Sequence, residues 1–432
     1  MSSELKRVLS PAMVWGLGVG YVISGNYFGW NLGLAQGGTL GLAIATGCVI
    51  VMYITFTYSY AELACAIPKA GGAFDYASRA LGKEMAFIAG MAQNIEFMFA
   101  PPAIAFAVGS YMNLFFPTIP ALNFSIAAYV IFTVLNIYGI RAAATFELIV
   151  TVVAVSGLIF FCVITLPHFE PANLQRNSLP RGVEGIFAAV PFAIWFFLGI
   201  EGVANLAEET KDPHRTMSRG FLSALFTLVI LCMFTFMTAI GVGGWEAIVY
   251  QADGTTADSP LPMAIQQITG TEGMTYKILI VAGLFGLAAS LNGLMLAAGR
   301  SAFEFFKTQF GAGPLGRVHP RFKTPANALL LNMVIGIIAL FSGRTGEVIT
   351  ISVFGALTLY AISAVAVIAL RKKEPQLVRP FRLPMYPYFP LIALIIALVA
   401  LAAVIVYNFL LSALYVLIVA ACYGIFKVIK RI

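Results

Sequence analysis

The sequence predicts an all-α integral membrane protein with twelve transmembrane helices. Its 432 residues are 60% hydrophobic and only 10% charged, whereas a soluble domain carries about 25% charged residues. Apolar runs of about 18 residues or more, long enough to cross a bilayer, recur along the whole chain. No connector between them could form a soluble domain, so residues 1–432 are treated as a single transmembrane domain.

The expected helices are the apolar runs between polar connectors. The longest expected outer connector, 245–274, is partly apolar and is expected to contain a short surface helix. The expected spans are residues 11–36, 39–66, 84–116, 122–139, 144–166, 184–208, 217–243, 275–306, 326–342, 346–370, 388–408 and 410–428.

The distribution of positive charge supports this count and orients the chain. If the N-terminus is cytoplasmic, only four of the 26 lysines and arginines fall in outer connectors, namely Arg176, Arg181, Lys277 and Arg344. Basic residues accumulate on the cytoplasmic side of membrane proteins. The sequence therefore predicts a multi-pass protein of the cytoplasmic membrane with both termini inside. The net charge of +7 is explained by this topology and does not indicate a nucleic-acid partner.

The first span contains an unusual polar interruption. Within GYVISGNYFGW, residues 20–30, Ser24, Gly25 and Asn26 stand together in a hydrophobic helix. Glycine weakens a helix by about 1 kcal/mol relative to alanine, and serine and asparagine offer the backbone competing hydrogen bonds. The stretch therefore predicts a broken helix at about 23–26, with close helix packing as the alternative.

The sixth span carries a comparable interruption. Gly199 and Gly202 bracket Glu201 within PFAIWFFLGIEGVANLAEE, residues 191–209, and predict a break at about 199–202. Each interrupted span opens a block of five, 11–166 and 184–370, and the two blocks start on opposite sides of the membrane. This pattern predicts an inverted repeat, with two further spans at 388–428 outside it, and such paired breaks indicate a transporter binding site.

Several longer motifs are shared with a known family. They are ISGN in the first span, AELACAIPKAGGAFDYASRALG at 61–82, FLGIE at 197–201, ANLAEETKDPHRTMSRG at 204–220 and GPLGRVHPRFKTPANA at 313–328. With these motifs the chain resembles the amino acid–polyamine–organocation superfamily of transporters over essentially its full length. The stretches GYVISGNYFGWNLGLAQGG and EFMFAPPAIA look most like those of ethanolamine permeases.

The resemblance implies a LeuT-like fold of two inverted five-helix halves plus two peripheral helices, working by alternating access. It implies a substrate site at mid-membrane between spans 1, 3, 6 and 8. The residues that it places there are Ile23, Ser24, Gly25 and Asn26 from span 1, and Trp195, Phe197, Gly199, Ile200 and Glu201 from span 6.

Polar residues inside other spans are further candidates for the site. Burying an ionisable side chain in a membrane span costs free energy, so such residues are usually functional. Glu96 in span 3 is expected to bind a substrate ammonium or carry a proton, or else to form an internal salt bridge or hydrogen bond. Glu201 is expected either to carry a coupling proton or to brace the broken helix. Asn292 in span 8 is a candidate hydrogen-bond partner of the substrate. Glu147 in span 5 is expected at the membrane interface, and Glu62 at an inner gate or structural contact.

The side chains that couple transport to protons or to sodium in related transporters have no counterpart in spans 5 and 8 of this sequence. Some proton-coupled relatives carry a lysine in span 5, where Ala154 stands here. Sodium-coupled members of the wider fold use a hydroxyl pair in span 8, where LAASLNG offers only Ser290. We therefore expect no sodium site, and Glu96 and Glu201 are the candidates for proton coupling.

The sequence thus predicts a secondary active or facilitative transporter that imports a small cationic amino alcohol, ethanolamine first. The alternative is an amino acid permease of the same fold, by proton symport or exchange. The five cysteines lie in or at the ends of apolar spans, and the three histidines lie beside prolines in connectors. No metal site, cofactor, enzyme motif or obligate protein partner is expected, and the expected partners are a small amine and the bilayer.

Overall fold

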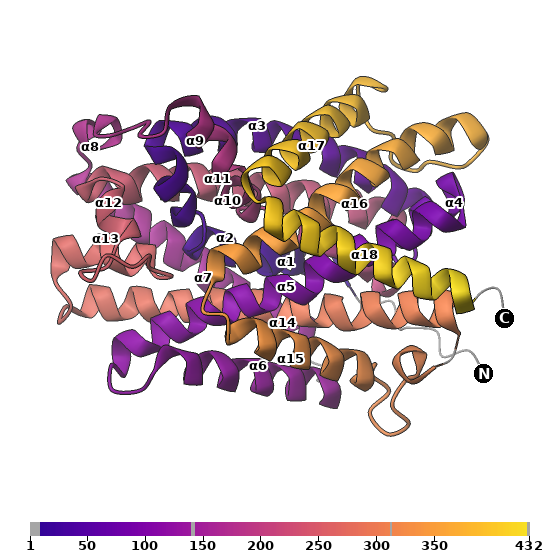
Figure 1. Cartoon of the computed structure of the whole chain (residues 1–432), viewed down its shortest axis with the longest axis horizontal. Helices are drawn as coiled ribbons and strands as arrows, with labels where there is room; N and C mark the ends of the chain where they lie inside the picture. The colour runs from indigo at the N-terminus through magenta and orange to yellow at the C-terminus, as the bar shows by residue number, and fades with distance from the viewer. Residues whose placement is uncertain (1–8, 140–142, 312, 430–432) are drawn as a thin grey trace.

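The computed structural model describes residues 9–139, 143–311 and 313–429. Within them the chain is almost entirely helical, and its long helices run roughly side by side as one bundle (Figure 1). Ten helical stretches are long and apolar enough to cross a membrane, and α1 and α15 are shorter apolar helices. Together they account for the twelve expected spans.

The spans correspond to the helices in chain order. The first half contains α1 (Pro11–Val22), α2 (Ser24–Tyr27), α3 (Asn31–Ala66), α5 (Lys83–Phe115), α6 (Ala121–Tyr138) and α7 (Ala143–Thr165). The second contains α9 (Gly182–Ala188), α10 (Val190–Trp195), the 3-10 helix η2 (Ile200–Glu209), α11 (Pro213–Gly243), α14 (Met274–Phe310), α15 (Ala326–Leu340) and α16 (Thr345–Lys373). The last two spans are α17 (Tyr388–Tyr407) and α18 (Phe409–Ile429).

Spans 1 and 2 meet inside α3. Gly38 has φ 64° and ψ −171°, which is not helical, so the helix axis is interrupted there. The residues before it complete span 1 and those after it form span 2. The expected boundary between 36 and 39 is therefore confirmed.

Short helices occupy the connectors at the two ends of the bundle. At one end lie α8 (Pro171–Gln175), α12 (Glu246–Val249) and α13 (Pro260–Thr269) (Figure 1). The surface helix expected within 245–274 is thus confirmed. At the other end lie α4 (Ala73–Leu81), which was not expected, and the connector that contains η3 (Pro314–Gly316).

The expected outer and inner connectors separate to opposite ends, although which end faces the cytoplasm stays a prediction. Five basic residues used in that prediction, Lys6, Arg7, Arg141, Lys430 and Arg431, lie outside the described residues.

The packing of the spans is matched between the two halves. Span 1 packs on spans 5 and 7, and span 6 packs in the corresponding way on spans 10 and 2. Span 3 packs on span 10, and its counterpart, span 8, packs on span 5. Span 4 packs on span 3, span 9 packs on span 8, and spans 4 and 9 pack on each other. This exchange of partners supports the inverted halves proposed for residues 11–166 and 184–370.

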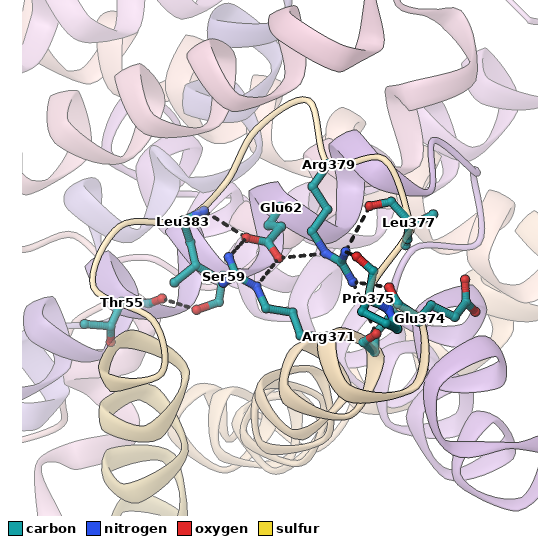
Figure 2. Close-up of polar contacts among 10 residues, drawn as sticks. Thr55, Ser59, Glu62, Arg371, Glu374, Pro375, Leu377, Arg379 and Leu383 are labelled. Atoms are coloured by element: carbon teal, nitrogen blue, oxygen red, sulfur yellow. Dashed lines mark hydrogen bonds and ion pairs between the residues drawn. The ribbon is translucent and has the colours of Figure 1, made fainter.

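A buried ion-pair network fixes the connector between spans 10 and 11 (Figure 2). Glu62, near the end of span 2, is only 2% exposed. Its carboxylate accepts hydrogen bonds from Arg371 Nε and Nη2, at 2.8 and 2.5 Å, and from the Leu383 amide at 2.8 Å. Arg379 lies 3.4 Å from Glu62 Oε1 and donates to the Leu370, Glu374 and Leu377 carbonyl oxygens. Two arginines of the basic run 371–382, Arg371 and Arg379, therefore form contacts within the protein.

Candidate functional site

The first span is interrupted twice within GYVISGNYFGW. Helix α1 ends at Val22, and the single turn α2 follows Ile23. Phe28 is then fully extended, with φ −160° and ψ 173°. The predicted break at 23–26 is therefore only partly right, because residues 24–27 keep a helical turn and the larger departure comes four residues later.

Ser290 of span 8 bridges the first interruption. Its hydroxyl donates a hydrogen bond to the Gly20 carbonyl oxygen at 2.6 Å and accepts one from the Ser24 amide at 3.0 Å. A single hydroxyl from a neighbouring helix thus satisfies a carbonyl and an amide of the interrupted backbone, as a dry environment requires.

The sixth span breaks after Trp195. Residues 196–199 form turns, and η2 continues the chain from Ile200 as a 3-10 helix. Gly199 has φ 96°, a backbone conformation that side chains with a Cβ disfavour. The predicted break at 199–202 therefore begins about three residues earlier, and Gly199 is its last residue.

The two breaks touch each other. A Cβ atom on Gly25 would lie 2.4 Å from the Trp195 carbonyl oxygen, so only glycine permits this approach. The Trp195 indole N–H donates to the Phe28 carbonyl oxygen at 3.1 Å, and the two rings pack edge to face at 5.5 Å. Trp195 therefore joins the two broken helices.

Two carboxyl groups face each other beside these breaks. Glu96 of α5 and Glu201 of η2 have no exposed surface and lie close enough to interact. Within the described part of the chain, each of these carboxyl groups interacts with the other, and no basic side chain forms an ion pair with either of them. Burying uncompensated carboxylates is costly, so this pair suits a positive charge.

Close helix packing positions Glu96. Gly355 of α16 lies so near α5 that a Cβ there would come within 2.4 Å of the Ala92 carbonyl oxygen and 2.8 Å of the Glu96 amide. Ser352, one turn earlier on α16, donates to the Glu96 carbonyl oxygen at 2.9 Å. Spans 3 and 10 are thus locked together at the level of this carboxyl group.

Two tyrosines, Tyr360 and Tyr53, lie beside the carboxyl pair; they were not predicted as site residues. The Tyr360 hydroxyl of span 10 donates to Glu201 Oε2 at 2.9 Å. The Tyr53 hydroxyl of span 2 lies 3.0 Å from that of Tyr360 and donates to the Ile194 carbonyl oxygen at 3.3 Å. No sequence signal separates them from the other 15 tyrosines, because aromatic residues make up 13% of the chain.

The remaining predicted residues of spans 1 and 6 are enclosed in the same region. Ile23, Ser24, Asn26, Phe197 and Ile200 are each at most 3% exposed. The Asn26 side chain has no hydrogen-bond partner on either its oxygen or its nitrogen in the described part of the chain. The region is therefore closed to solvent, and besides the two carboxyl groups it contains the Asn26 amide, which could hydrogen-bond a ligand.

Two other polar residues, Asn292 and Glu147, contact each other; a substrate-binding role for Asn292 stays a prediction, whereas the expected place of Glu147 is corrected. Asn292 does not join the carboxyl pair, because its amide contacts Glu147 Oε2 at 3.2 Å and Asn136 Nδ2 at 3.0 Å. Glu147 was expected at the interface but is only 1% exposed. Since Gly20 of span 1 has no side chain, that span can cover the carboxyl group.

No group of three or more histidine, cysteine, aspartate or glutamate side chains is placed to hold a metal ion in the parts of the chain that the structure describes.

The family assignment follows from the extent of a sequence match. The amino acid permease family model matches residues 9–426, nearly the whole chain. This chain belongs to the amino acid permease family. The expected membership in the amino acid–polyamine–organocation superfamily is confirmed, and the permease is a multi-pass membrane transporter and not an enzyme.

Curated relatives of the permease differ in their named substrates. It is 29% identical to an uncharacterized transporter of Rhizobium meliloti (strain 1021), over 89% of this chain and 83% of the relative. It is 26% identical to a branched-chain amino acid permease of Bacillus subtilis (strain 168), over 89% and 85%. It is 25% identical to a low-affinity putrescine importer of Escherichia coli (strain K12), over 87% and 84%.

Proposed function

We propose that this permease imports a small cationic amino alcohol, with ethanolamine as the first candidate, and that Glu96 and Glu201 bind its ammonium group. The observation that carries the proposal is the pair of buried carboxyl groups without a basic partner in the described chain. An ammonium ion between them would supply the missing charge and hydrogen-bond donors.

The backbone at the first break favours an amine without a carboxylate. Amide N–H groups at a helix break can bind an anion. Here the Ser24 amide donates to Ser290, and the Gly29 amide donates to Asn31 Oδ1 at 3.0 Å. Since these two donors are already used, an amino alcohol suits the site better than an amino acid.

The two breaks supply the hinges for alternating access. A mid-membrane site formed by discontinuous helices opens to one side at a time when one group of helices rocks against the other. We further propose that the permease lies in the cytoplasmic membrane with both termini inside.

The second candidate is an amino acid permease of the same fold. It is favoured by the similarity to a branched-chain amino acid permease, whereas the similarity to a putrescine importer favours a cationic amine. The two candidates differ in whether a substrate carboxylate is needed for binding.

Thermal denaturation of the purified full chain tests the proposal, because a ligand that binds the folded state raises its melting temperature. The panel is ethanolamine, choline, 2-aminopropanol, putrescine, alanine, leucine, arginine and ethanol. We expect a shift with ethanolamine that is absent with alanine and ethanol, and that is lost in Glu96→Gln. A shift with alanine or leucine and none with ethanolamine would replace the proposal by the amino acid permease.

A further inference from the structure

A second buried carboxyl group lies away from the pair at the breaks. Glu147 of α7 is buried in the region where α7 packs on α1 and α14. Its Oε2 accepts a hydrogen bond from Asn292 Nδ2 at 3.2 Å, and Asn136 Nδ2 donates to Asn292 Oδ1 at 3.0 Å. Its Oε1 has no hydrogen-bond partner within the described residues. One oxygen of this carboxyl group is therefore hydrogen-bonded and the other is not, and the neighbouring polar groups are uncharged amides.

Among the groups that face Glu147 in the described part of the chain there is no cation. Asn292 of α14 is its hydrogen-bond donor, Asn136 of α6 donates to Asn292, and Thr151 of its own helix donates to the Gly16 carbonyl oxygen at 3.0 Å. From α1 the titratable neighbour is Tyr21, which is itself buried. Arg300 of α14 also interacts with Tyr21 and is paired with Glu209 at 2.6 Å. Within the described chain, no basic side chain forms an ion pair with Glu147.

The cluster touches the broken helix itself. A Cβ atom on Gly20 would lie 2.9 Å from Glu147 Oε1 and 2.7 Å from Thr151 Oγ1. The carbonyl oxygen of the same Gly20 accepts the hydrogen bond from Ser290 that bridges the first interruption. The carboxyl group therefore lies directly against the half of span 1 that must move if this helix is a hinge.

We infer that Glu147 is a proton-binding site, separate from the pair at the breaks, that couples transport to proton movement. The inference rests on the proposed transport function. The carboxylate takes one proton from water on one side of the membrane and becomes a neutral carboxylic acid. In that form it can remain dry against Gly20, whereas an unpaired carboxylate there is costly. When α1 separates from α7 and water enters, the proton leaves to the other side.

The direct test is independent of the substrate. Infrared difference spectra of the purified full chain, recorded across a pH titration, report the C=O stretching band of each protonated carboxyl group. We expect a component that disappears in Glu147→Gln and remains in Glu184→Gln, an exposed control on α9. A pH-dependent band that is identical in wild type and Glu147→Gln would overturn the inference.

The second test measures coupling in proteoliposomes with labelled ethanolamine. A pH gradient of about one unit can drive about tenfold accumulation through one coupled proton. We expect Glu147→Gln to lose this accumulation but to keep counterflow without a gradient, as Glu184→Gln keeps both. Tenfold accumulation in Glu147→Gln would refute coupling through this residue.

These experiments separate the two proposals. If ethanolamine is neither bound nor carried, the proposed function fails, while the infrared result still decides whether Glu147 binds a proton. If the glutamine variant does not fold, Glu147→Asp replaces it in the infrared test. Its band must shift in frequency or in titration midpoint, and an unchanged band would overturn the inference.

Discussion

At the residue scale, Gly25 is the contact point of the two broken helices. A methyl group there would lie 2.4 Å from the Trp195 carbonyl oxygen and 3.1 Å from Phe196 Cα, and backbone atoms cannot rotate away. We expect Gly25→Ala to destabilise the protein by about 1–3 kcal/mol and to abolish ligand-induced thermal stabilisation. The control is Gly47→Ala on the exposed face of α3, where nothing lies within 4 Å. Equal melting temperatures for the two variants would contradict the close approach.

Tyr360 tests the hydrogen bond to Glu201. Tyr360→Phe removes the hydroxyl that donates to Oε2 of that carboxylate. Hydrogen bonds to charged groups contribute about 1.5–3 kcal/mol, so we expect ligand affinity to fall roughly 10- to 100-fold. Tyr129→Phe is the matched control, since that buried hydroxyl donates to Asn332 Oδ1 at 2.7 Å on spans 4 and 9. Binding isotherms for both variants provide the measurement, and equal affinities would argue against a role for Tyr360.

Asp258, in an end connector outside the membrane spans, gives a pH dependence. Burial raises the pKa of its carboxyl group from 3.8 to about 6, opposed by a hydrogen bond from Thr345 at 2.8 Å. The folded state therefore binds this proton more tightly than the unfolded state, and its stabilisation is present below about pH 4 and is lost as pH rises through about 6.

An asparagine at this position would remain neutral at every pH. We therefore expect Asp258→Asn to gain in melting temperature over wild type between pH 4 and pH 7. The underlying change is on the order of 1–3 kcal/mol. Melting curves of both proteins at several pH values measure it, and a difference that does not change with pH would contradict the assignment.

At the scale of elements, the Glu62 network fixes the ends of spans 2 and 10 and the connector to span 11 (Figure 2). Removing one partner of a buried ion pair costs about 3–5 kcal/mol, because the other charge stays buried. We expect Glu62→Ala to cause a large fall in melting temperature and to expose the connector 374–383 to proteolysis.

The matched control for this network is Glu374→Ala. Its partner Arg79 is 2.6 Å away, but the two side chains are 40% and 35% exposed. Water screens such pairs, so the melting temperature should barely change. Similar losses in the two variants would show that burial does not set the strength of the Glu62 network.

At the scale of the whole molecule, orientation is the property to test. Ala252 and Gln376 are exposed in connectors that were predicted to lie on opposite sides of the membrane. In a chain whose five native cysteines are replaced, we expect Ala252→Cys to react with an impermeant maleimide from outside intact cells. Gln376→Cys should react only after the membrane is permeabilised. The reverse pattern would invert the predicted topology.

The whole-molecule architecture was largely predictable because it depends on local sequence. Apolar runs and basic connectors predicted the twelve spans, and the Gly38 interruption lies between the first two expected spans. Helix α4 was not predicted, because it is a short amphipathic helix within a connector. The breaks were assigned to the correct spans but displaced by three to five residues, since helix propensity alone does not decide where tertiary contacts end a helix.

The candidate site was only partly predictable. Glu96 and Glu201 stood out because carboxyl groups in apolar spans are costly wherever they lie. By contrast, Tyr53 and Tyr360 became visible only when spans 2 and 10 were brought to Glu201. Glu147 was misplaced, and its contact with Asn292 was not predicted, because both environments depend on α1, α6 and α14 packing together.

The sequence by itself determined the membrane class, the number of spans, the family and the presence of two interrupted helices, because each is encoded in local composition or motif. Only the tertiary structure decided which polar groups are neighbours. Glu96 and Glu201 are 105 residues apart and Glu147 and Asn292 are 145 apart, and no local rule pairs positions at such separations. The role of a buried carboxyl group can be inferred only when the packing of the helices shows whether it has a basic partner.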